Sequence, residues 1–146
     1  MKINDLILRT VSRFVAFIIL TLAIYLFFAG HYAPGGGFIG GLVIASGFVL
    51  LYLTYDIERI EKAIPLDFKK LAAFGVFLAV GTGFGSVLYG ADFLTQVAHK
   101  YDVPFIGEKE IGTVMIFEMG VALTVVGVVM TIIVGIAEGS DDTWKR

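Results

Sequence analysis

The segment between the first two apolar blocks of this chain reads Gly30-His31-Tyr32-Ala33-Pro34-Gly35-Gly36-Gly37-Phe38-Ile39-Gly40-Gly41. Six of these twelve residues are glycine, and one is a proline with a fixed φ angle, so the backbone favours close contacts and turns that a Cβ atom would prevent. Irregular backbone near membrane depth persists only where protein or enclosed water satisfies its polar groups. We therefore expect this segment to pack against protein rather than to face lipid.

Four apolar blocks account for most of the 146 residues. They predict transmembrane helices at about residues 14–30, 39–55, 71–91 and 111–137, within a single four-span membrane domain over residues 1–146. A hydrocarbon core of roughly 30 Å needs about 20 helical residues, with a range of about 17–25. The only charged residue within the four blocks is Glu118. The predicted fold class is an all-α membrane protein with four transmembrane helices.

The composition excludes several classes of function. The chain is 58% hydrophobic and 16% charged, whereas soluble domains are about 45–50% apolar and about 25% charged. It has no cysteine and only two histidines, which argues against a disulfide framework and a metal centre. The net charge of −2 comes with no basic patch of the kind that binds nucleic acid. Since no nucleophile, metal or cofactor motif is present, we expect neither an enzyme nor a bound cofactor.

The basic residues predict the orientation in the membrane. Three lie in the N-terminal tail (Lys2, Arg9 and Arg13), four in the second loop and two in the C-terminal tail, against two in the third loop and none in the first. Short cytoplasmic loops carry an excess of lysine and arginine. Both termini are therefore predicted to be cytoplasmic, with the glycine-rich segment toward the external face.

The loops give three further expectations. The charged stretch after Tyr55 has a helical pattern, so the second span is expected to continue as helix until Pro65 stops it. Asp67 is expected to cap the next helix. The third loop, around Tyr101, is expected to be an interfacial segment with an aromatic anchor.

Small residues recur at the spacing that lets two helices approach closely. G-x-x-x-G spacings join Gly36 to Gly40, Gly37 to Gly41 and Gly81 to Gly85. Such spacings are typical of helix–helix contacts in membranes. We predict that these glycines, with Pro34, Gly35 and Phe38, shape contacts with other helices of this chain or of a neighbour.

Glu118 and His31 are the candidates for ion chemistry. A carboxylate inside a membrane span is costly and should face protein or water, or be protonated. Glu118 is therefore either a relay point for protons or sodium, or a carboxyl hydrogen-bonded at a helix interface. His31 lies at a helix end, where a histidine can titrate near neutral pH and pass protons, or simply hydrogen-bond at the interface.

The string Gly30-His31-x-x-Pro34-Gly35-Gly36-Gly37-Phe38-x-Gly40-Gly41-Leu42, on a four-span chain of this length, resembles the MnhB/MrpB-like family of the multisubunit Mrp-type sodium/proton antiporters. The resemblance implies a small hydrophobic subunit of a hetero-oligomeric complex in the cell membrane that moves sodium ions and protons. In such complexes the large subunits hold lysine and glutamate proton channels, whereas this chain has no lysine inside any apolar block. The resemblance also implies a position beside the sodium path, which makes Glu118 and His31 ion-path candidates and none of the residues catalytic.

Three other interpretations stay open at this point. Related subunits occur in membrane-bound hydrogenase-type complexes, where an antiporter module is coupled to electron transfer. Four spans with one intramembrane glutamate are also the minimum for a self-sufficient proton-coupled transporter. Such a transporter would need an aromatic-lined substrate cavity around Glu118, whereas the residues next to Glu118 include only one aromatic, Phe117. The third alternative is a scaffold protein with no contact to the transported ions.

Overall fold

The computed structural model describes residues 3–30, 35–55, 57–88, 90, 92, 94, 98–103 and 107–144 of the chain. The helices within these ranges are α1 (Ile3–Ala29), α2 (Gly36–Thr54), α3 (Ile57–Ala63), α4 (Phe68–Leu88) and α5 (Thr113–Trp144). Four of them, α1, α2, α4 and α5, are long and apolar enough to cross a membrane. The prediction of an all-α membrane protein with four transmembrane helices is confirmed.

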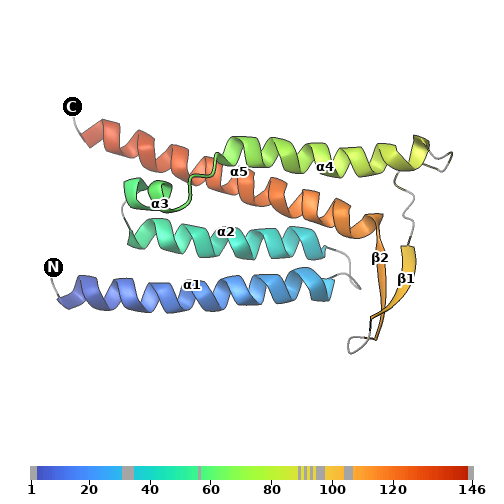
Figure 1. Ribbon diagram of the computed structural model, residues 1–146. Helices are drawn as coiled ribbons and strands as arrows, with labels where there is room; N and C mark the ends of the chain where they lie inside the picture. The colour runs from blue at the N-terminus through green and yellow to red at the C-terminus, as the bar shows by residue number, and fades with distance from the viewer. Residues whose placement is uncertain are drawn as a thin grey trace.

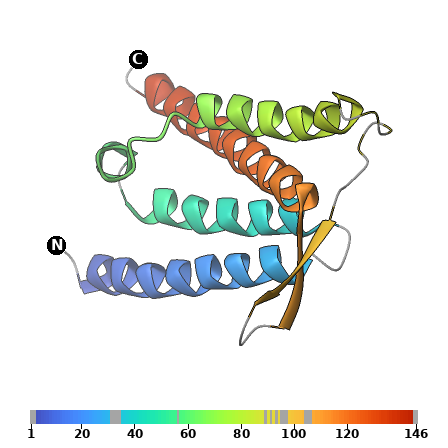
Figure 2. The same cartoon turned by 45° about the vertical axis from the view of Figure 1, so that its right-hand side comes forward.

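The four long helices form a row rather than a closed bundle (Figures 1 and 2). The extensive contacts join α1 to α2, α2 to α5, and α5 to α4. Helices α1 and α4 therefore lie at the two edges of the row. The N-terminal end of α1, the short helix α3 and the C-terminal end of α5 all lie at one end of the molecule (Figure 1).

Small residues form most of the interior of this row. The buried small residues include Ser12, Ala16, Ala23, Gly36, Gly37, Gly40, Gly41, Ala45, Gly47, Gly75, Gly83 and Ala122. Since lipid tails are as apolar as leucine, helices in a membrane associate largely through close van der Waals contact, which small residues permit. A cluster of larger side chains, centred on Phe68, Val126 and Met130, lies near the start of α4.

The predicted continuation of the second span into the loop is wrong at Tyr55. Helix α2 ends at Thr54, Tyr55 adopts an extended conformation with φ −115° and ψ 151°, and α3 is a separate helix of seven residues. The tyrosine hydroxyl donates a hydrogen bond to the carbonyl oxygen of Arg9 at 3.2 Å and accepts one from the guanidinium of Arg13 at 3.3 Å. These contacts with α1 accompany the break in the helix. Helix α3 itself ends at Ala63, two residues before Pro65.

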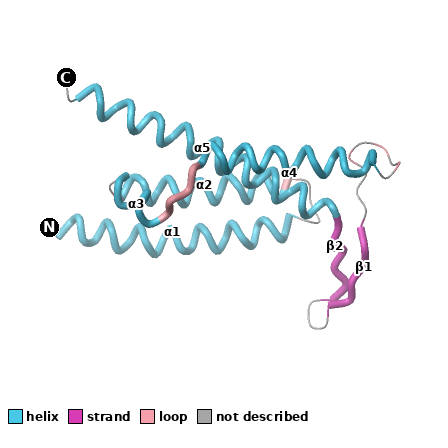
Figure 3. Tube along the Cα trace, turned by 45° about the horizontal axis from the view of Figure 1, so that its top comes forward, coloured by secondary structure: helices cyan, strands magenta, loops and turns pink. Residues whose placement is uncertain are grey.

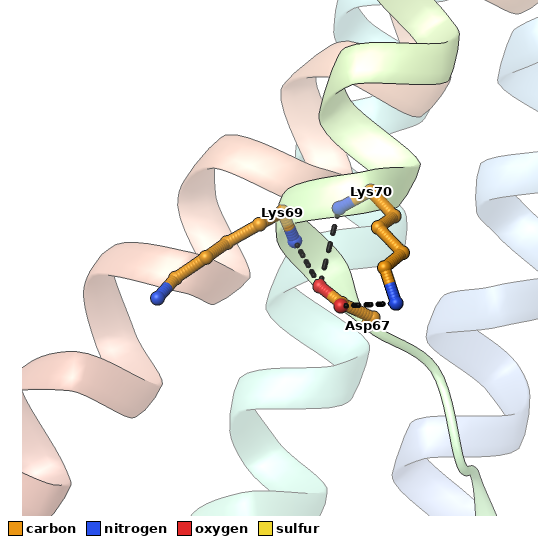
Figure 4. Close-up of polar contacts among 3 residues, drawn as sticks. All are labelled: Asp67, Lys69 and Lys70. Carbon is orange, nitrogen blue, oxygen red and sulfur yellow. Dashed lines mark hydrogen bonds and ion pairs between the residues drawn. The ribbon is translucent and has the colours of Figure 1, made fainter.

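The start of α4 has the cap that the sequence predicts (Figure 4). The Oδ1 atom of Asp67 accepts hydrogen bonds from the backbone N–H groups of Lys69 at 3.1 Å and Lys70 at 3.2 Å. Its Oδ2 atom lies 3.2 Å from the Nζ atom of Lys70. The backbone and side-chain hydrogen bonds from Lys70 lower the pKa of Asp67 below its ordinary value of 3.8. A charged acceptor here satisfies N–H groups that have no partner within the helix.

A β-hairpin precedes α5 and was not predicted. Strands β1 (Ala98–Val103) and β2 (Gly107–Gly112) pair antiparallel, from Ala98 opposite Gly112 to Val103 opposite Gly107. The hairpin projects from the end of the row opposite α3 (Figures 1 and 3). The predicted block at 111–137 therefore begins two residues before the helix, because Ile111 and Gly112 belong to β2. The side chains of both strands, including the predicted anchor Tyr101, lie outside what the structure describes.

Candidate functional site

The glycine-rich segment forms a tight corner between α1 and α2. Gly35 precedes α2 with φ 102° and ψ 11°, a left-handed conformation that glycine adopts without strain, and its carbonyl oxygen accepts a 2.9 Å hydrogen bond from the N–H of Ile39. A Cβ atom on Gly36 would lie 2.8 Å from the Cα of Gly30, too close for any real side chain. The end of α1 and the start of α2 are therefore in backbone contact.

Helix α2 presents glycines to two neighbouring helices at once. On the side of α1, a Cβ atom on Gly40 would lie 3.1 Å from the Cβ of Phe27, and one on Gly47 would lie 3.3 Å from Ile19. On the side of α5, a Cβ atom on Gly41 would lie 2.9 Å from the carbonyl oxygen of Ala122. The two overlapping G-x-x-x-G spacings thus serve different interfaces, which explains why both occur in one helix.

Gly37 brings the glycine-rich segment onto Glu118. A Cβ atom at Gly37 would collide with the carbonyl oxygen of Glu118 and would lie 3.0 Å from its Cα. The Glu118 side chain is half-buried, and its Oε2 atom is buried. Since Glu118 is the sixth residue of α5, it lies about 8 Å along the helix from Thr113, near the end that carries the hairpin. The structure therefore joins two features that the sequence analysis singled out separately.

Not every predicted site residue joins this contact. His31 and Pro34 lie outside the described residues. The Phe38 side chain is 52% exposed, so it points away from the interfaces that its neighbour Gly37 makes. A Cβ atom on Gly81 or Gly85 would meet nothing within 4 Å. Among the described residues the packing predicted for these two glycines is not made, and it stays a prediction about a neighbouring subunit.

The interface between α4 and α5 also rests on small residues. The stripe of Gly75, Ala79 and Gly83 in α4 is recognisable in the sequence, whereas Gly120 and Gly127 of α5 were not predicted. A Cβ atom on Gly120 would lie 2.7 Å from the backbone N of Ala79, and one on Gly127 would lie 2.5 Å from the backbone N of Ala72. From the other side, a Cβ atom on Gly75 would lie 2.5 Å from the backbone N of Thr124. The seven-residue separation of Gly120 and Gly127 places both glycines on one face of the helix, and this spacing could have predicted a close contact with another helix.

Glu118 lies outside the apolar groove that the described helices form. An apolar groove of about 350 Å³ runs between the helices, with a lining that includes Phe27, Phe48, Met119 and Leu123 but not Glu118. No group of three or more acidic or histidine side chains able to hold a metal ion comes together in the described ranges. A half-buried carboxyl beside a fixed backbone contact can bind and release a proton or contribute oxygen ligands to a cation.

The chain matches known proteins over nearly its whole length. Residues 7–131 match the family model described as a domain related to the MnhB subunit of Na+/H+ antiporter. A Na(+)/H(+) antiporter subunit of Alkalihalophilus pseudofirmus is 51% identical over 138 residues, which cover 94% of this chain and 96% of that protein. A Na(+)/H(+) antiporter subunit of Bacillus subtilis is 49% identical over 137 residues, with 94% and 96% covered.

A solved structure gives the same result. The structure of the Mrp complex from Dietzia sp. DQ12-45-1b contains a chain that matches 87% of this one with a TM-score of 0.70 and 32% sequence identity. The match covers 13% of that chain, so the four-helix unit corresponds to a small part of a much longer polypeptide there. The resemblance inferred from the glycine-rich segment is confirmed: this chain belongs to the family of proteins related to the MnhB subunit of Na+/H+ antiporters.

Proposed function

We propose that this chain is the MnhB-type component of a multisubunit Na+/H+ antiporter in the cell membrane. The observation that carries the proposal is the 51% identity, over 94% of this chain, with a protein named as a subunit of a Na(+)/H(+) antiporter. In this function the chain is a component of a secondary transporter rather than an enzyme. Both termini face the cytoplasm, which agrees with the bias of the basic residues and with the position of both terminal helix ends at one end of the row.

The open row of helices supports a role within an assembly. The helices at the two edges expose large apolar side chains, among them Phe17 of α1 and Phe77 and Leu88 of α4. A single row of helices cannot enclose a polar path on all sides, so an ion that passes Glu118 needs walls from other subunits. The absence of lysine from the apolar blocks agrees with a division of labour in which other subunits carry the main proton relay.

Glu118 is the residue through which this chain contributes to the ion path. Its buried Oε2 atom lies in an apolar helix, where a carboxyl is retained at a cost of a few kcal/mol. Gly37 holds the backbone at this position against α2, so the α5 backbone at Glu118 keeps a constant place relative to the glycine-rich segment. A scaffold without ion contact would keep sodium/proton exchange when this carboxyl is replaced by an amide.

The test substitutes Glu118 by glutamine within the intact complex. Sodium-induced dissipation of ΔpH is measured in membrane vesicles, and a pull-down on the same membranes measures assembly. We expect exchange to fall at least tenfold, on the order of a lost proton-transfer group, with the complex still assembled. Asp92→Asn, at an exposed acid outside the helices, is the control and should leave exchange unchanged. Full exchange in the assembled Glu118→Gln complex would leave this chain as a scaffold only.

A further inference from the structure

A groove rich in arginine lies where α1 meets the end of α2. It has a volume of about 530 Å³ and is lined by Leu6, Arg9, Thr10, Arg13, Phe14, Tyr55 and Arg59. The lining combines three guanidinium groups with exposed apolar side chains, since Leu6 and Phe14 are 53% and 67% exposed. This combination of cationic and apolar surface is what an amphiphile with an anionic head requires.

Tyr55 organises the cationic side of this groove. Its hydroxyl accepts a hydrogen bond from the guanidinium of Arg13 at 3.3 Å, and its ring centroid lies 5.8 Å from the guanidinium carbon of Arg9. The side chains of two arginines from α1 are thereby both in contact with one residue at the end of α2. Within the described part of the chain, neither Arg9 nor Arg13 forms an ion pair with an acidic side chain. Two guanidinium groups one helical turn apart repel each other and favour a bound anion between them.

The depth of the groove matches the headgroup region. The sixteen residues from Phe14 to the end of α1 at Ala29 carry no charge and span about 24 Å. The hydrocarbon core is roughly 30 Å thick, so with Ala29 at one boundary, Arg9 lies at the other boundary and Arg13 lies one helical turn inside it. The long side chain of Arg13 reaches from there to the headgroups. Arg59 belongs to α3, which lies at the same end of the row (Figure 1). The cationic groups therefore lie at the level of lipid phosphates, and Phe14 lies at the level of acyl chains.

From this arrangement we infer that the groove binds the headgroup of an anionic phospholipid such as phosphatidylglycerol. The phosphodiester lies among the guanidinium groups of Arg9, Arg13 and Arg59, and an acyl chain runs past Phe14 toward the membrane centre. Guanidinium groups bind phosphate oxygens through paired hydrogen bonds, and basic pockets at the ends of transmembrane helices bind anionic headgroups. The site is separate from Glu118, which lies near the opposite end of the row.

The experiment uses the assembled complex in detergent and a photoactivatable phosphatidylglycerol. Label recovered on this chain is measured while unlabelled phosphatidylglycerol, phosphatidylcholine or inorganic phosphate competes. We expect phosphatidylglycerol to compete and the other two not to compete at equal concentration. The Arg9→Gln/Arg13→Gln variant should lose affinity by roughly 10- to 30-fold, as expected for the loss of two charges near the membrane surface.

The matched control is Lys62→Gln/Lys69→Gln, which removes two charges at the same end of the row but outside the groove. It should bind phosphatidylglycerol as the parent complex does. Equal labelling of the Arg9→Gln/Arg13→Gln variant, an equal loss in the lysine control, or competition by inorganic phosphate as strong as by the lipid would each overturn the inference. If the double arginine variant does not assemble, Arg59→Gln on the exposed side of the groove provides the same comparison, with an expected loss of about fivefold.

Discussion

At the scale of single residues, the helices of this protein meet backbone to backbone at several glycines. Gly37 lies directly on the backbone of Glu118, and Gly36 lies on that of Gly30. A backbone atom cannot move aside as the end of a flexible side chain can, so even one added methyl group must separate the helices. The glycines therefore determine how near Glu118 lies to α2, and hence the geometry of the candidate ion path.

We predict that Gly37→Ala destabilises the folded chain by about 1–3 kcal/mol, because its methyl group overlaps the carbonyl oxygen of Glu118. Thermal unfolding of the purified complex measures this effect. Gly135→Ala is the control, since a Cβ atom there meets nothing within 4 Å. Alanine also favours a helix over glycine by up to about 1 kcal/mol, so the control should be neutral or slightly stabilising. Equal stability of the two variants would contradict the close contact at Gly37.

At the scale of elements, α4 has a defined start and two different faces. The cap at Asp67 satisfies the first N–H groups of the helix, and its inner face packs on α5 through Gly75 and Ala79. Gly81 and Gly85 lie on another face of the same helix, where no atom of the part that the structure describes lies within 4 Å of an added Cβ. The helix is thus anchored at one end and on one side, and open on the other.

The cap predicts a dependence of stability on pH. Since the pKa of Asp67 is lower in the folded chain than its ordinary value of 3.8, the charged carboxylate stabilises the folded state above that pH. This contribution disappears as the pH falls through the lowered pKa. Asp67→Ala should lower the thermal stability at neutral pH and remove this part of the acid dependence. Asp67→Asn keeps an oxygen acceptor but loses the ion pair with Lys70. Its thermal stability at neutral pH should therefore lie between those of the parent protein and Asp67→Ala. Identical pH profiles for all three proteins would contradict the role of the cap.

The outer face of α4 predicts a contact with a neighbouring subunit. We expect Gly81→Leu/Gly85→Leu to leave the amount of this chain in the membrane unchanged, because no side chain of the chain is displaced. The same variant should reduce recovery of the other subunits in a pull-down by several-fold, since a leucine fills the groove that admits a neighbouring helix closely. Normal recovery of the complex would assign this face to lipid.

At the scale of the whole molecule, the row of four helices has two different ends. One end carries α3, the arginine groove and the terminal ends of α1 and α5, and the other carries the hairpin and the corner at Gly35 (Figure 1). The basic residues concentrate at the first end, and this bias supports the proposal that this end faces the cytoplasm.

Single cysteines can test this orientation, because the chain contains none. A membrane-impermeant maleimide added to intact cells should label Asp92→Cys and should label Lys69→Cys only after permeabilisation. Lys69 lies in the first turn of α4 and Asp92 follows its last turn, so the two positions report on opposite ends of the same helix. Labelling of Lys69→Cys in intact cells would invert the assignment.

The amino-acid sequence by itself determined the membrane class, the four spans, the cap at Asp67 and the family. These follow from local quantities: the length of charge-free blocks, the chemistry of one residue before a helix, and a short motif. The break at Tyr55 was not predicted, because a helical charge pattern does not reveal contacts with Arg9 and Arg13 more than forty residues earlier.

Only the tertiary structure decided which helices are neighbours and which glycines matter. The same G-x-x-x-G spacing forms contacts at Gly36, Gly37, Gly40 and Gly41, yet leaves Gly81 and Gly85 open, because the spacing defines a groove but not what fills it. The spatial order of the helices, α1, α2, α5, α4, also brings Gly37 onto Glu118 and gathers three arginines in one groove. That order is set by the packing of whole helix faces, which no local stretch of sequence contains.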